Sequence, residues 1–449
     1  MEKDNWDSDK LGNLCDVVLG RTPSRSKKQY WGIGTSWTSI RDMSQRIITE
    51  TKEQITEEGA IASRSRLIPK GTLLMSFKLS VGKLAFAAKD LYTNEAIAAL
   101  PIKDLKRIDQ NYLYYLLQNI PLIGGNQAVM GQTLNKSSLE NLKLFFPKNI
   151  KDQKHIAQVL GDCEELIALR RESIALLDEL VKSTFLEMFG DPTQQDYNRE
   201  YTNLGNLGDW KSGGTPSRKK AENFGGEIPW ITSGELNEVY ISEAKEHITE
   251  TGLIGSNAKL LQSGTLLLGM YDTAALKSSI CTKEMTCNQA IAYSKLDETK
   301  CLPEFVYTAI QLGKEYYRSK QRGVRQKNMN LTMIKELEIP FPHIDAQTKF
   351  VSIFKEIQIS KALFSYHLLE LEHFYGRLSQ DAFKGELDLS GLKLRDGKEL
   401  SDLLELENSN NKEPVNTPSY KLDDYMDMEV KLNKVAEGKV AYKKRSDGI

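Results

Sequence analysis

The chain of 449 residues is poor in the side chains that build metal and disulfide sites. It has five cysteines and five histidines, and only Cys281 and Cys287 lie close together. No HExxH motif occurs, and the cysteine spacing fits neither a zinc-binding pattern nor a disulfide framework. We therefore expect no metal site in this chain.

Long hydrophobic runs and an excess of charge of one sign are also missing. Apolar stretches such as residues 96–102 fall far short of the roughly 18 residues that a membrane span needs, and the first ten residues contain no apolar signal core. These features predict a cytoplasmic protein with no membrane partner. The net charge of -1 argues against indiscriminate nucleic-acid binding. Local basic patches remain compatible with it, and positive charge is concentrated in residues 1–150.

Catalytic motifs are absent as well. The sequence contains no GxxxxGK[ST] phosphate loop, no GxGxxG after a strand, no GxSxG and no NPPY-like tetrapeptide of adenine methyltransferases. We therefore expect a non-catalytic chain whose chemistry belongs to partners. An autonomous enzyme of unrecognised type is the weakest alternative.

What the sequence does contain is an internal duplication. Five motifs of the first half return 193 residues later, and two more return after 194 and 195 residues, so one unit is used twice. The repeated segments are LGNL at Leu11 and Leu204, GRTPSR at Gly20 and GGTPSR at Gly213, WTSI at Trp37 and WITS at Trp230, QITEEG at Gln54 and HITETG at His247, GTLLMS at Gly71 and GTLLLG at Gly264, NEAIA at Asn94 and NQAIA at Asn288, and FFP at Phe145 and PFP at Pro340.

The first part of each unit has the pattern of a small mixed domain. Residues 11–148 and 204–342 contain short apolar clusters separated by Gly and Pro, which predicts short strands and turns. One helix is expected within each part, at residues 111–120 and 304–312.

The second part of each unit, residues 152–189 and 345–384, reads as one long helix with a seven-residue apolar repeat. Asp152 and Asp345 stand where an N-cap is expected. The expected seam residues are Ile156, Leu160, Ile167, Ile174, Leu177 and Val181 in the first helix and Phe350, Ile357, Phe364, Leu371 and Leu378 in the second, whose companion row is the mixed set Ile353, Ser360, His367, Phe374 and Asp381.

Two arrangements of these helices are open. Each helix could cover the sheet of its own unit, but a heptad pattern sustained over more than three repeats favours a helix–helix seam. Chain order then makes the pair antiparallel, about 60 Å long at about 1.5 Å per residue. The predicted fold class is α+β, with two tandem mixed α/β domains separated by an antiparallel coiled coil and related by approximate two-fold symmetry.

The domain boundaries follow from the repeat. We expect a first domain over residues 1–150, a spacer helix over 151–200, a second domain over 201–342 and a second spacer helix over 343–384. Residues 385–449 have no counterpart in the first half and are charged and rich in turn formers, which predicts a mostly flexible extension.

The order of the repeated motifs resembles a known family. G-x-TPS, W-x-S/T, GTLL, N-E/Q-A-I-A and an FP strand leading into a heptad helix, twice over residues 11–384, are similar to the DNA-specificity subunit of Type I restriction-modification systems. The resemblance implies that each domain is a target-recognition domain for one half of a bipartite, asymmetric sequence in double-stranded DNA. It also implies that the paired helices set the gap between the half-sites.

The same resemblance implies the partners. Two methyltransferase subunits would dock on the chain and modify adenine N6, restriction/translocase subunits would join the full prokaryotic complex, and S-adenosylmethionine would bind the methyltransferase, with no cofactor in this chain. Alternatives are a subunit of a methylation-only or Type IIB-like system, or a coiled-coil scaffold whose domains bind no DNA. The near-zero charge and the acidic first helix motivate the scaffold.

The loop at TPS in each unit is the first candidate DNA contact. Gly20 or Gly214 can supply positive φ, and the loop then presents hydroxyls, amides and cations that suit phosphates. The alternative is a solvated basic turn. The candidate residues are Arg21, Thr22, Ser24, Arg25, Lys27 and Lys28 in the first unit and Thr215, Ser217, Arg218, Lys219 and Lys220 in the second.

Divergent polar stretches provide candidates for base contact. After Trp37 and Trp230, themselves expected to pack in the core, Arg41 could reach guanine and Glu235 could accept from cytosine, with a structural role equally open. Asn94, Asn288 and Gln289 are expected to secure a backbone turn rather than contact adenine. The further candidates are Ser39 and Thr232, then Lys78, Ser80, Lys83, Tyr271 and Thr273, for which a polar hairpin tip is the alternative, and the basic cluster Arg318, Lys320, Arg322, Arg325 and Lys327.

Overall fold

The computed structural model describes residues 5–78, 80–120, 134–194, 196–271, 274–319 and 329–389. These residues fall into two compact units. One comprises the described residues up to Val159 together with those from Gln380 onward, and the other is Leu160–Ser379. We call residues 5–149 head 1 and residues 201–343 head 2. None of the helices in the described ranges has the length and apolar character to cross a membrane.

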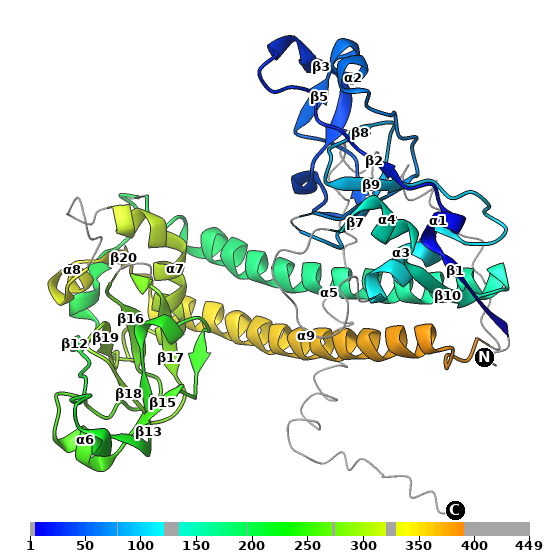
Figure 1. Cartoon of the computed structure of the whole chain (residues 1–449). Helices are drawn as coiled ribbons and strands as arrows, with labels where there is room; N and C mark the ends of the chain where they lie inside the picture. Colours follow the sequence, from blue (N-terminus) through cyan, green and yellow to red (C-terminus); the bar gives the residue numbers. More distant parts are fainter. Residues whose placement is uncertain are drawn as a thin grey trace, which may run out of the picture. The chain divides into compact units, whose positions relative to one another are not determined.

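The described residues of head 1 form three small sheets (Figure 1). Short helices connect them, and α3 follows the five-stranded sheet along the chain. The five-stranded sheet has the order β2 (Val18–Leu19), β9 (Ile97–Leu100), β6 (Leu73–Ser76), β7 (Leu84–Ala87), β4 (Ile47–Ile48), the three-stranded sheet has the order β5 (Glu53–Ile55), β3 (Trp31–Thr38), β8 (Tyr92–Thr93), β1 (Trp6–Lys10) pairs with β10 (Lys143–Pro147), and the α-helices are α1 (Leu11–Leu14), α2 (Glu57–Ser63), α3 (Gln110–Asn119) and α4 (Lys136–Glu140).

Head 2 repeats this topology strand for strand. The predicted helices appear at equivalent places, as α3 in head 1 and α7 in head 2. The elements of head 2 are β12 (Lys211–Ser212), β19 (Ile291–Ser294), β16 (Leu266–Gly269), β17 (Ser278–Cys281) and β14 (Tyr240–Ile241) in the larger sheet, β15 (Glu246–Ile248), β13 (Phe224–Ile231) and β18 (Thr286–Cys287) in the smaller one, the pair β11 (Tyr201–Asn203) and β20 (Glu338–Pro340), and the helices α6 (Glu250–Ile254), α7 (Pro303–Ser319) and α8 (Leu331–Lys335).

The central strands of the larger sheets are buried on both faces. Along β16, Leu266 and Leu268 enter the core that also contains Phe305 of α7, whereas Leu267 enters a second core with Ile231. This alternation is the period of two that a strand imposes on its side chains. A continuous apolar run such as GTLLLG therefore marks a strand covered on both sides.

Two long helices account for the second part of each repeat. They are α5 (Ile150–Phe189) and α9 (Ile344–Lys384). The expected N-caps are wrong by a few residues, because Asp152 and Asp345 lie inside the first turn, where a carboxylate suits the helix dipole. Both helices end at a glycine in the left-handed region, with φ of 72° at Gly190 and 78° at Gly385.

Within Leu160–Ser379, α5 and α9 lie side by side and antiparallel, as predicted (Figure 1). Several side-chain pairs join the two helices, and from Glu164–Tyr375 to Asp178–Lys361 the residue numbers of α9 fall as those of α5 rise. The pairs are Glu164 with Tyr375 (2.9 Å), Arg171 with Glu372 (2.6 Å), Asp178 with Lys361, and Arg170 over the ring of Phe364 (4.3 Å to the centroid).

The residues predicted for the seam of α5 and for the strong seam of α9 are all buried or half-buried, and Phe350 packs in the core of head 2. The companion row predicted for α9 is wrong. Ile353 and Phe374 are 40% and 49% exposed, and the buried row lies one residue later, at Phe354, Lys361, Leu368, Tyr375 and Ala382. The prediction selected residues by apolar character and therefore excluded a row that contains Lys361 and Tyr375. These two polar side chains are tolerated there because each hydrogen-bonds a carboxylate of α5.

A buried glutamine joins the start of each long helix to its head. Gln153 of α5 accepts a hydrogen bond from the Asp109 amide (2.8 Å) and donates to the carbonyl oxygens of Arg107 (3.1 Å) and Pro147 (2.7 Å). Gln347 of α9 makes the same three bonds in head 2. Its partners are the amide of Leu302 (3.0 Å) and the carbonyls of Lys300 (3.1 Å) and Pro342 (2.8 Å).

The far end of each helix packs against the same position of a head. Phe189 at the end of α5 contacts Phe305 of α7, with ring centroids 5.0 Å apart. Phe383 at the end of α9 contacts Tyr112 of α3, with centroids 5.8 Å apart. Each head therefore holds one helix start and one helix end. The predicted C-terminal extension lies outside the described residues from residue 390 onward.

We expect Gln347→Leu to destabilise the chain by about 2 kcal/mol, because the backbone groups of Lys300, Leu302 and Pro342 lose a fully buried partner. Urea unfolding followed by circular dichroism measures the effect. Lys349→Leu, at an exposed position of the same helix, is the matched control. Equal stability of the two variants would show that the glutamine junction contributes nothing.

Candidate nucleic-acid interface

The loop after β2 is held against the turn that follows β8. The Gly20 amide donates to the carbonyl of Ile97 (3.0 Å), and the Arg21 amide donates to that of Thr93 (2.8 Å). A Cβ on Gly20 would lie 2.2 Å from the Asn94 carbonyl oxygen. Glycine is therefore required here by close approach of two backbones.

Head 2 repeats the same contacts. The amides of Gly213 and Gly214 donate to the carbonyls of Ile291 (2.9 Å) and Cys287 (3.0 Å). A Cβ on Gly213 would lie 2.3 Å from the Asn288 carbonyl oxygen, and one on Gly214 2.2 Å from the Ala258 amide. The expectation of positive φ is wrong, because neither Gly20 nor Gly214 is among the positive-φ glycines.

The two tryptophans are core residues that also hold these loops. Trp37 and Trp230 are each 2% exposed. Their indole N–H groups donate to the carbonyls of Arg21 (3.0 Å) and Gly214 (2.9 Å). The preference for core packing at both positions is confirmed, and the tryptophans support the loops from beneath.

One arginine of each loop is held by a glutamate. Arg25 forms a bidentate pair with Glu53, with an Nη2 to Oε2 distance of 2.9 Å, and its guanidinium lies 3.7 Å from the centroid of the Trp31 ring. The hydrogen bonds to Glu53 raise the pKa of Arg25. Both side chains of the pair remain partly exposed. The arginine is therefore a positioned cation at the surface.

Head 2 contains the matching pair. Arg218 binds Glu246 with N to O distances of 3.0 and 3.1 Å, and its guanidinium lies 5.0 Å from the centroid of Phe224. The sequence reasoning missed the two glutamates. A signal was available, because glutamate follows the loop arginine by 28 residues in both repeats.

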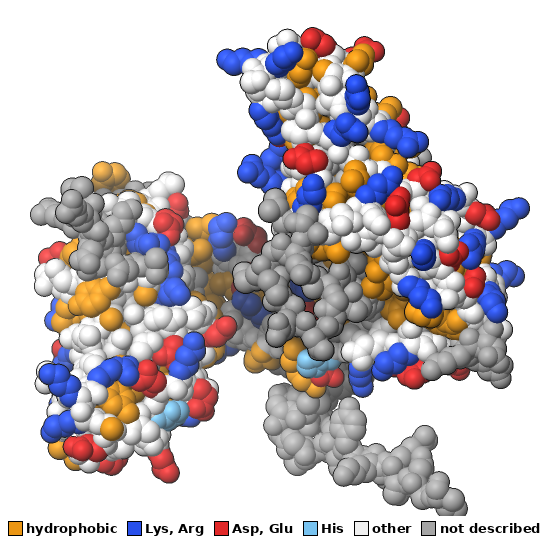
Figure 2. All heavy atoms as spheres, in the orientation of Figure 1, with side chains coloured by type: hydrophobic (Ala, Val, Ile, Leu, Met, Phe, Trp, Pro, Cys, Tyr) orange, Lys and Arg blue, Asp and Glu red, His pale blue; other side chains and the backbone are white. Residues whose placement is uncertain are grey.

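The remaining loop cations lie on the surface. The ammonium of Lys27 donates to the Tyr30 hydroxyl (3.1 Å), whereas Ser24 shares a hydrogen bond with Ser26 (2.8 Å). Figure 2 shows several Lys and Arg side chains on the part of head 1 that contains β3, β5 and α2. The other predicted residues exposed in the two loops are Arg21, Lys28, Ser217, Lys219 and Lys220.

The loop threonines bind the N-E/Q-A-I-A turn. The Thr22 hydroxyl donates to Glu95, and the Thr215 hydroxyl donates to Gln289. Asn94 and Asn288 cap the same turns, since their side-chain oxygens accept from the Ala96 amide (3.0 Å) and the Ala290 amide (3.1 Å). The predicted turn-securing role of the two asparagines is confirmed.

Three of the predicted base contacts take part in local capping. Oδ2 of Asp42 accepts from the amide and the hydroxyl of Ser39, at 2.8 Å each. Glu235 accepts from the amide of Thr232 (2.9 Å), from its hydroxyl (2.7 Å) and from the Lys245 amide (2.8 Å). These bonds favour the structural alternative at Ser39, Thr232 and Glu235. Arg41 is exposed at the equivalent corner of head 1.

The last group of candidates is scattered. The Lys78 ammonium lies 5.5 Å from the Phe77 ring centroid, and Arg318 at the end of α7 pairs with Glu315 (3.2 Å). Ser80 and Lys83 are exposed beyond the end of β6, and Tyr271 is partly exposed beyond the end of β16. Thr273, Lys320, Arg322, Arg325 and Lys327 lie outside the described residues.

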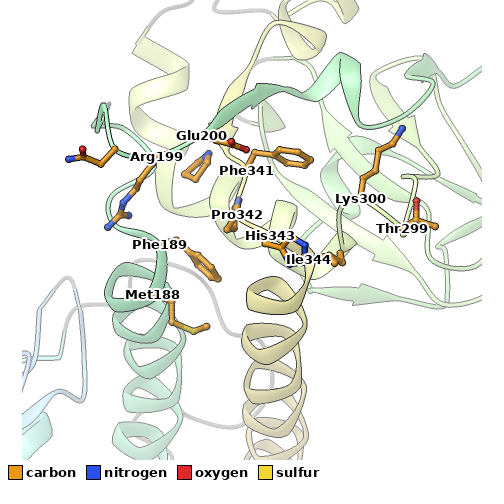
Figure 3. Close-up of a pocket in the computed structure, with 12 residues that line it drawn as sticks. Met188, Phe189, Arg199, Glu200, Thr299, Lys300, Phe341, Pro342, His343 and Ile344 are labelled. Carbon is orange, nitrogen blue, oxygen red and sulfur yellow. The ribbon is translucent and has the colours of Figure 1, made fainter.

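A cavity of about 590 Å³ lies elsewhere in head 2, where the long helices meet it (Figure 3). Met188 and Phe189 line it from the end of α5, Arg199 from the connecting segment, and His343 from just before α9. The described part of the chain contains no cluster of His, Cys, Asp and Glu that could hold a metal.

The five cysteines are buried free thiols. Burial raises the pKa of Cys15 and of Cys301 to about 12. Because the thiolate is the nucleophilic form, neither side chain is a candidate for covalent chemistry.

We expect Glu235→Gln to destabilise head 2 at neutral pH by about 1 kcal/mol, because an amide keeps one acceptor oxygen for the Thr232 cap and cannot accept from the Lys245 amide with its other atom. Burial alone would raise the pKa of Glu235, but hydrogen bonds from the Lys245 and Thr232 amides and the Thr232 hydroxyl outweigh it and lower the pKa. The stabilisation is therefore complete above the unfolded-state pKa of about 4.3. It is lost as pH falls through the folded-state value.

Melting temperature against pH tests this. The wild type should lose stability in acid more steeply than the variant, and Glu238→Gln, at an exposed position nearby, should behave as wild type. A Glu235→Gln chain with unchanged stability but altered DNA preference would instead support base contact by Glu235.

Comparisons with known proteins agree with the duplication. The model of the Type I restriction modification DNA specificity domain matches residues 3–179 and again residues 198–372. Over 285 residues the chain is 25% identical to the MjaIX Type I restriction enzyme specificity subunit of Methanocaldococcus jannaschii, covering 59% of this chain and 65% of that protein. Over 262 residues it is 23% identical to the EcoR124I/EcoR124II specificity subunit of Escherichia coli, covering 54% and 61%. Each match therefore spans less than two thirds of the relative's length.

Solved structures show the same fold. The crystal structure of a Type I restriction-modification S subunit from M. genitalium has a TM-score of 0.52 at 16% identity and covers 86% of this chain and 97% of that one. A chain from a study of complex assembly and conformational transition in the type I R-M system has a TM-score of 0.56 at 13% identity, covering 85% and 98%. The two segments that the family model matches together span most of this chain. The chain therefore belongs to the Type I restriction modification DNA specificity family and carries that domain twice.

Proposed function

We propose that this chain is a non-catalytic, sequence-specific DNA-recognition subunit that reads a bipartite, asymmetric target with one head per half-site. One observation carries the proposal. The two heads share strand order, loop contacts and the Arg–Glu pair, yet they differ at equivalent exposed positions, where head 1 presents the cation Arg41 and head 2 has Gly234 with no side chain. A shared framework with different polar surfaces suits two different half-sites.

The basic loops are the proposed phosphate contacts. Arg25 and Arg218 are oriented by carboxylates, and exposed lysines follow them in both loops. Phosphate contacts position a protein on the duplex without selecting a sequence. The repetition of these loops in both heads fits a partner feature that both half-sites share, which is the backbone of DNA.

The paired helices are the proposed docking site for two methyltransferase subunits. Outside the seam, α5 carries four leucines between 48% and 61% exposed, spaced so that they share one face. These are Leu166, Leu169, Leu176 and Leu180. A contiguous exposed apolar stripe marks an interaction surface, and a helix of a partner subunit would cover it.

In the assembled complex the methyltransferase would bind S-adenosylmethionine, flip an adenine in each half-site and modify its N6. The helix pair would fix the unspecified gap between half-sites, and restriction/translocase subunits would join through the methyltransferases. A methylation-only or Type IIB-like system would use the same recognition subunit.

Exchange of residues 1–150 for the matching segment of a relative tests the proposal. Methylated adenines are then mapped in the host genome for the exchanged and the wild-type chain. The exchanged chain should change one half-site of the methylated motif and retain the other. A change in both halves would remove the idea of separate heads.

The scaffold alternative is tested separately by a gel shift over a salt series, with and without the methyltransferase. A chain that adds no sequence preference to its partner would favour the scaffold. Basic-loop contacts with phosphate predict binding that weakens as salt rises.

We expect the double variant Leu169→Glu and Leu176→Glu to lose co-purification with the methyltransferase subunit, because two carboxylates would be buried at an apolar contact. Its circular dichroism should match wild type, since neither residue lies in the α5–α9 seam. Glu172→Ala, at an exposed position of the same helix, is the control and should still bind. A double variant that retains its partner would place the docking surface elsewhere.

A further inference from the structure

The N-E/Q-A-I-A turn has one framework in both heads and one chemical difference. The Asn94 amide donates to the Thr38 carbonyl, and the Asn288 amide donates to the Ile231 carbonyl, each at 2.9 Å. The residue after each asparagine is exposed and accepts from the loop threonine. That residue is Glu95 in head 1 and Gln289 in head 2.

The threonine bond leaves opposite groups free at the two positions. In head 1, Thr22 occupies Oε2 of Glu95, and Oε1 has no other hydrogen-bond partner among the described residues. In head 2, Thr215 occupies Oε1 of Gln289, and Nε2 is likewise without one within the described ranges. The free group of Glu95 is therefore only an acceptor, whereas that of Gln289 is a donor.

Folding of the turn does not require this difference. The asparagine caps and the backbone bonds to the loop are the same in both heads. A threonine hydroxyl can donate equally to a carboxylate or an amide oxygen. A cap alone would accept either residue, so the hydrogen bonds of the turn do not require the contrast between Glu95 and Gln289.

Resting on the proposed function, we propose that Glu95 and Gln289 are specificity-determining residues that read one base edge in each half-site. Each side chain is held beside the basic loop that contacts phosphate, and its free group selects by hydrogen-bond polarity. Glu95 accepts from an exocyclic amino group, of cytosine N4 or adenine N6. Gln289 donates to a base acceptor such as guanine O6 or N7 or thymine O4.

The threonines act as positioning residues. By binding one atom of the side chain they fix the direction of the other, which lowers the conformational entropy lost on contact with a base. Glu95 also lies close enough to Arg25 to contribute, after Glu53, to the raised pKa of that arginine. The reading group and the cation of head 1 are therefore neighbours.

The isosteric exchanges Glu95→Gln and Gln289→Glu test the proposal in the full-length chain assembled with its methyltransferase subunit. Methylated-adenine mapping and competition with duplexes substituted at single base pairs are the readouts. Glu95→Gln should shift preference about tenfold at one position of the head 1 half-site and leave the other half-site unchanged. Gln289→Glu should do the same in the head 2 half-site alone.

Two further variants separate reading from folding. Thr22→Val should relax discrimination at the base pair that Glu95→Gln changes, without altering melting temperature by more than the control. Glu50→Gln, at an exposed carboxylate of head 1, should change nothing.

Suppose that the wild type methylates a two-part motif and that neither Glu95→Gln nor Gln289→Glu changes either half-site. This result would overturn the inference and leave the proposed function standing. A wild-type assembly that yields no motif would overturn both. A loss of methylation in both half-sites together would also overturn it, because it would assign the position to assembly.

Discussion

The structure depends on one constraint, which is that each long helix must bury its apolar row against the other. Neither α5 nor α9 can hide that row alone, and the antiparallel pairing places Arg170 over Phe364 and Asp178 beside Lys361. Polar residues within the seam are tolerated because each meets an opposite group on the facing helix. The seam thereby fixes one register and one direction for the pair.

The heads are attached to this pair by contacts that repeat. A buried glutamine satisfies the same three backbone groups at the start of each helix, and a phenylalanine at the end of each helix meets an aromatic ring of α3 or α7. Apart from the glutamine bonds to Pro147 and Pro342, these contacts join residues far apart in the chain. The contacts at the helix–head junctions are the same in both heads and stabilise the fold. The residues at the exposed turns differ between the heads.

The candidate interface also combines contacts that repeat in both heads with residues that differ between them. Glycines admit a close backbone approach, tryptophans donate to the loop carbonyls, and a glutamate orients one arginine, all twice. Among the predicted loop residues, these contacts involve Arg21, Arg25 and Arg218. Elsewhere in head 2, Glu235 is engaged by three local donors, which favours a structural role for it.

The sequence by itself determined the duplication, the extent of the long helices, the buried row of α5 and the place of the basic loops. These features follow from local composition and from periodicity, which the chain carries whatever it packs against. Only the tertiary structure decided which row of α9 accompanies its strong seam, that Arg25 is paired with Glu53, and that Thr22 orients Glu95 across 73 residues. The physical reason is that a side chain's hydrogen-bond partner depends on which strands and helices meet in space, and local composition and periodicity do not determine that meeting.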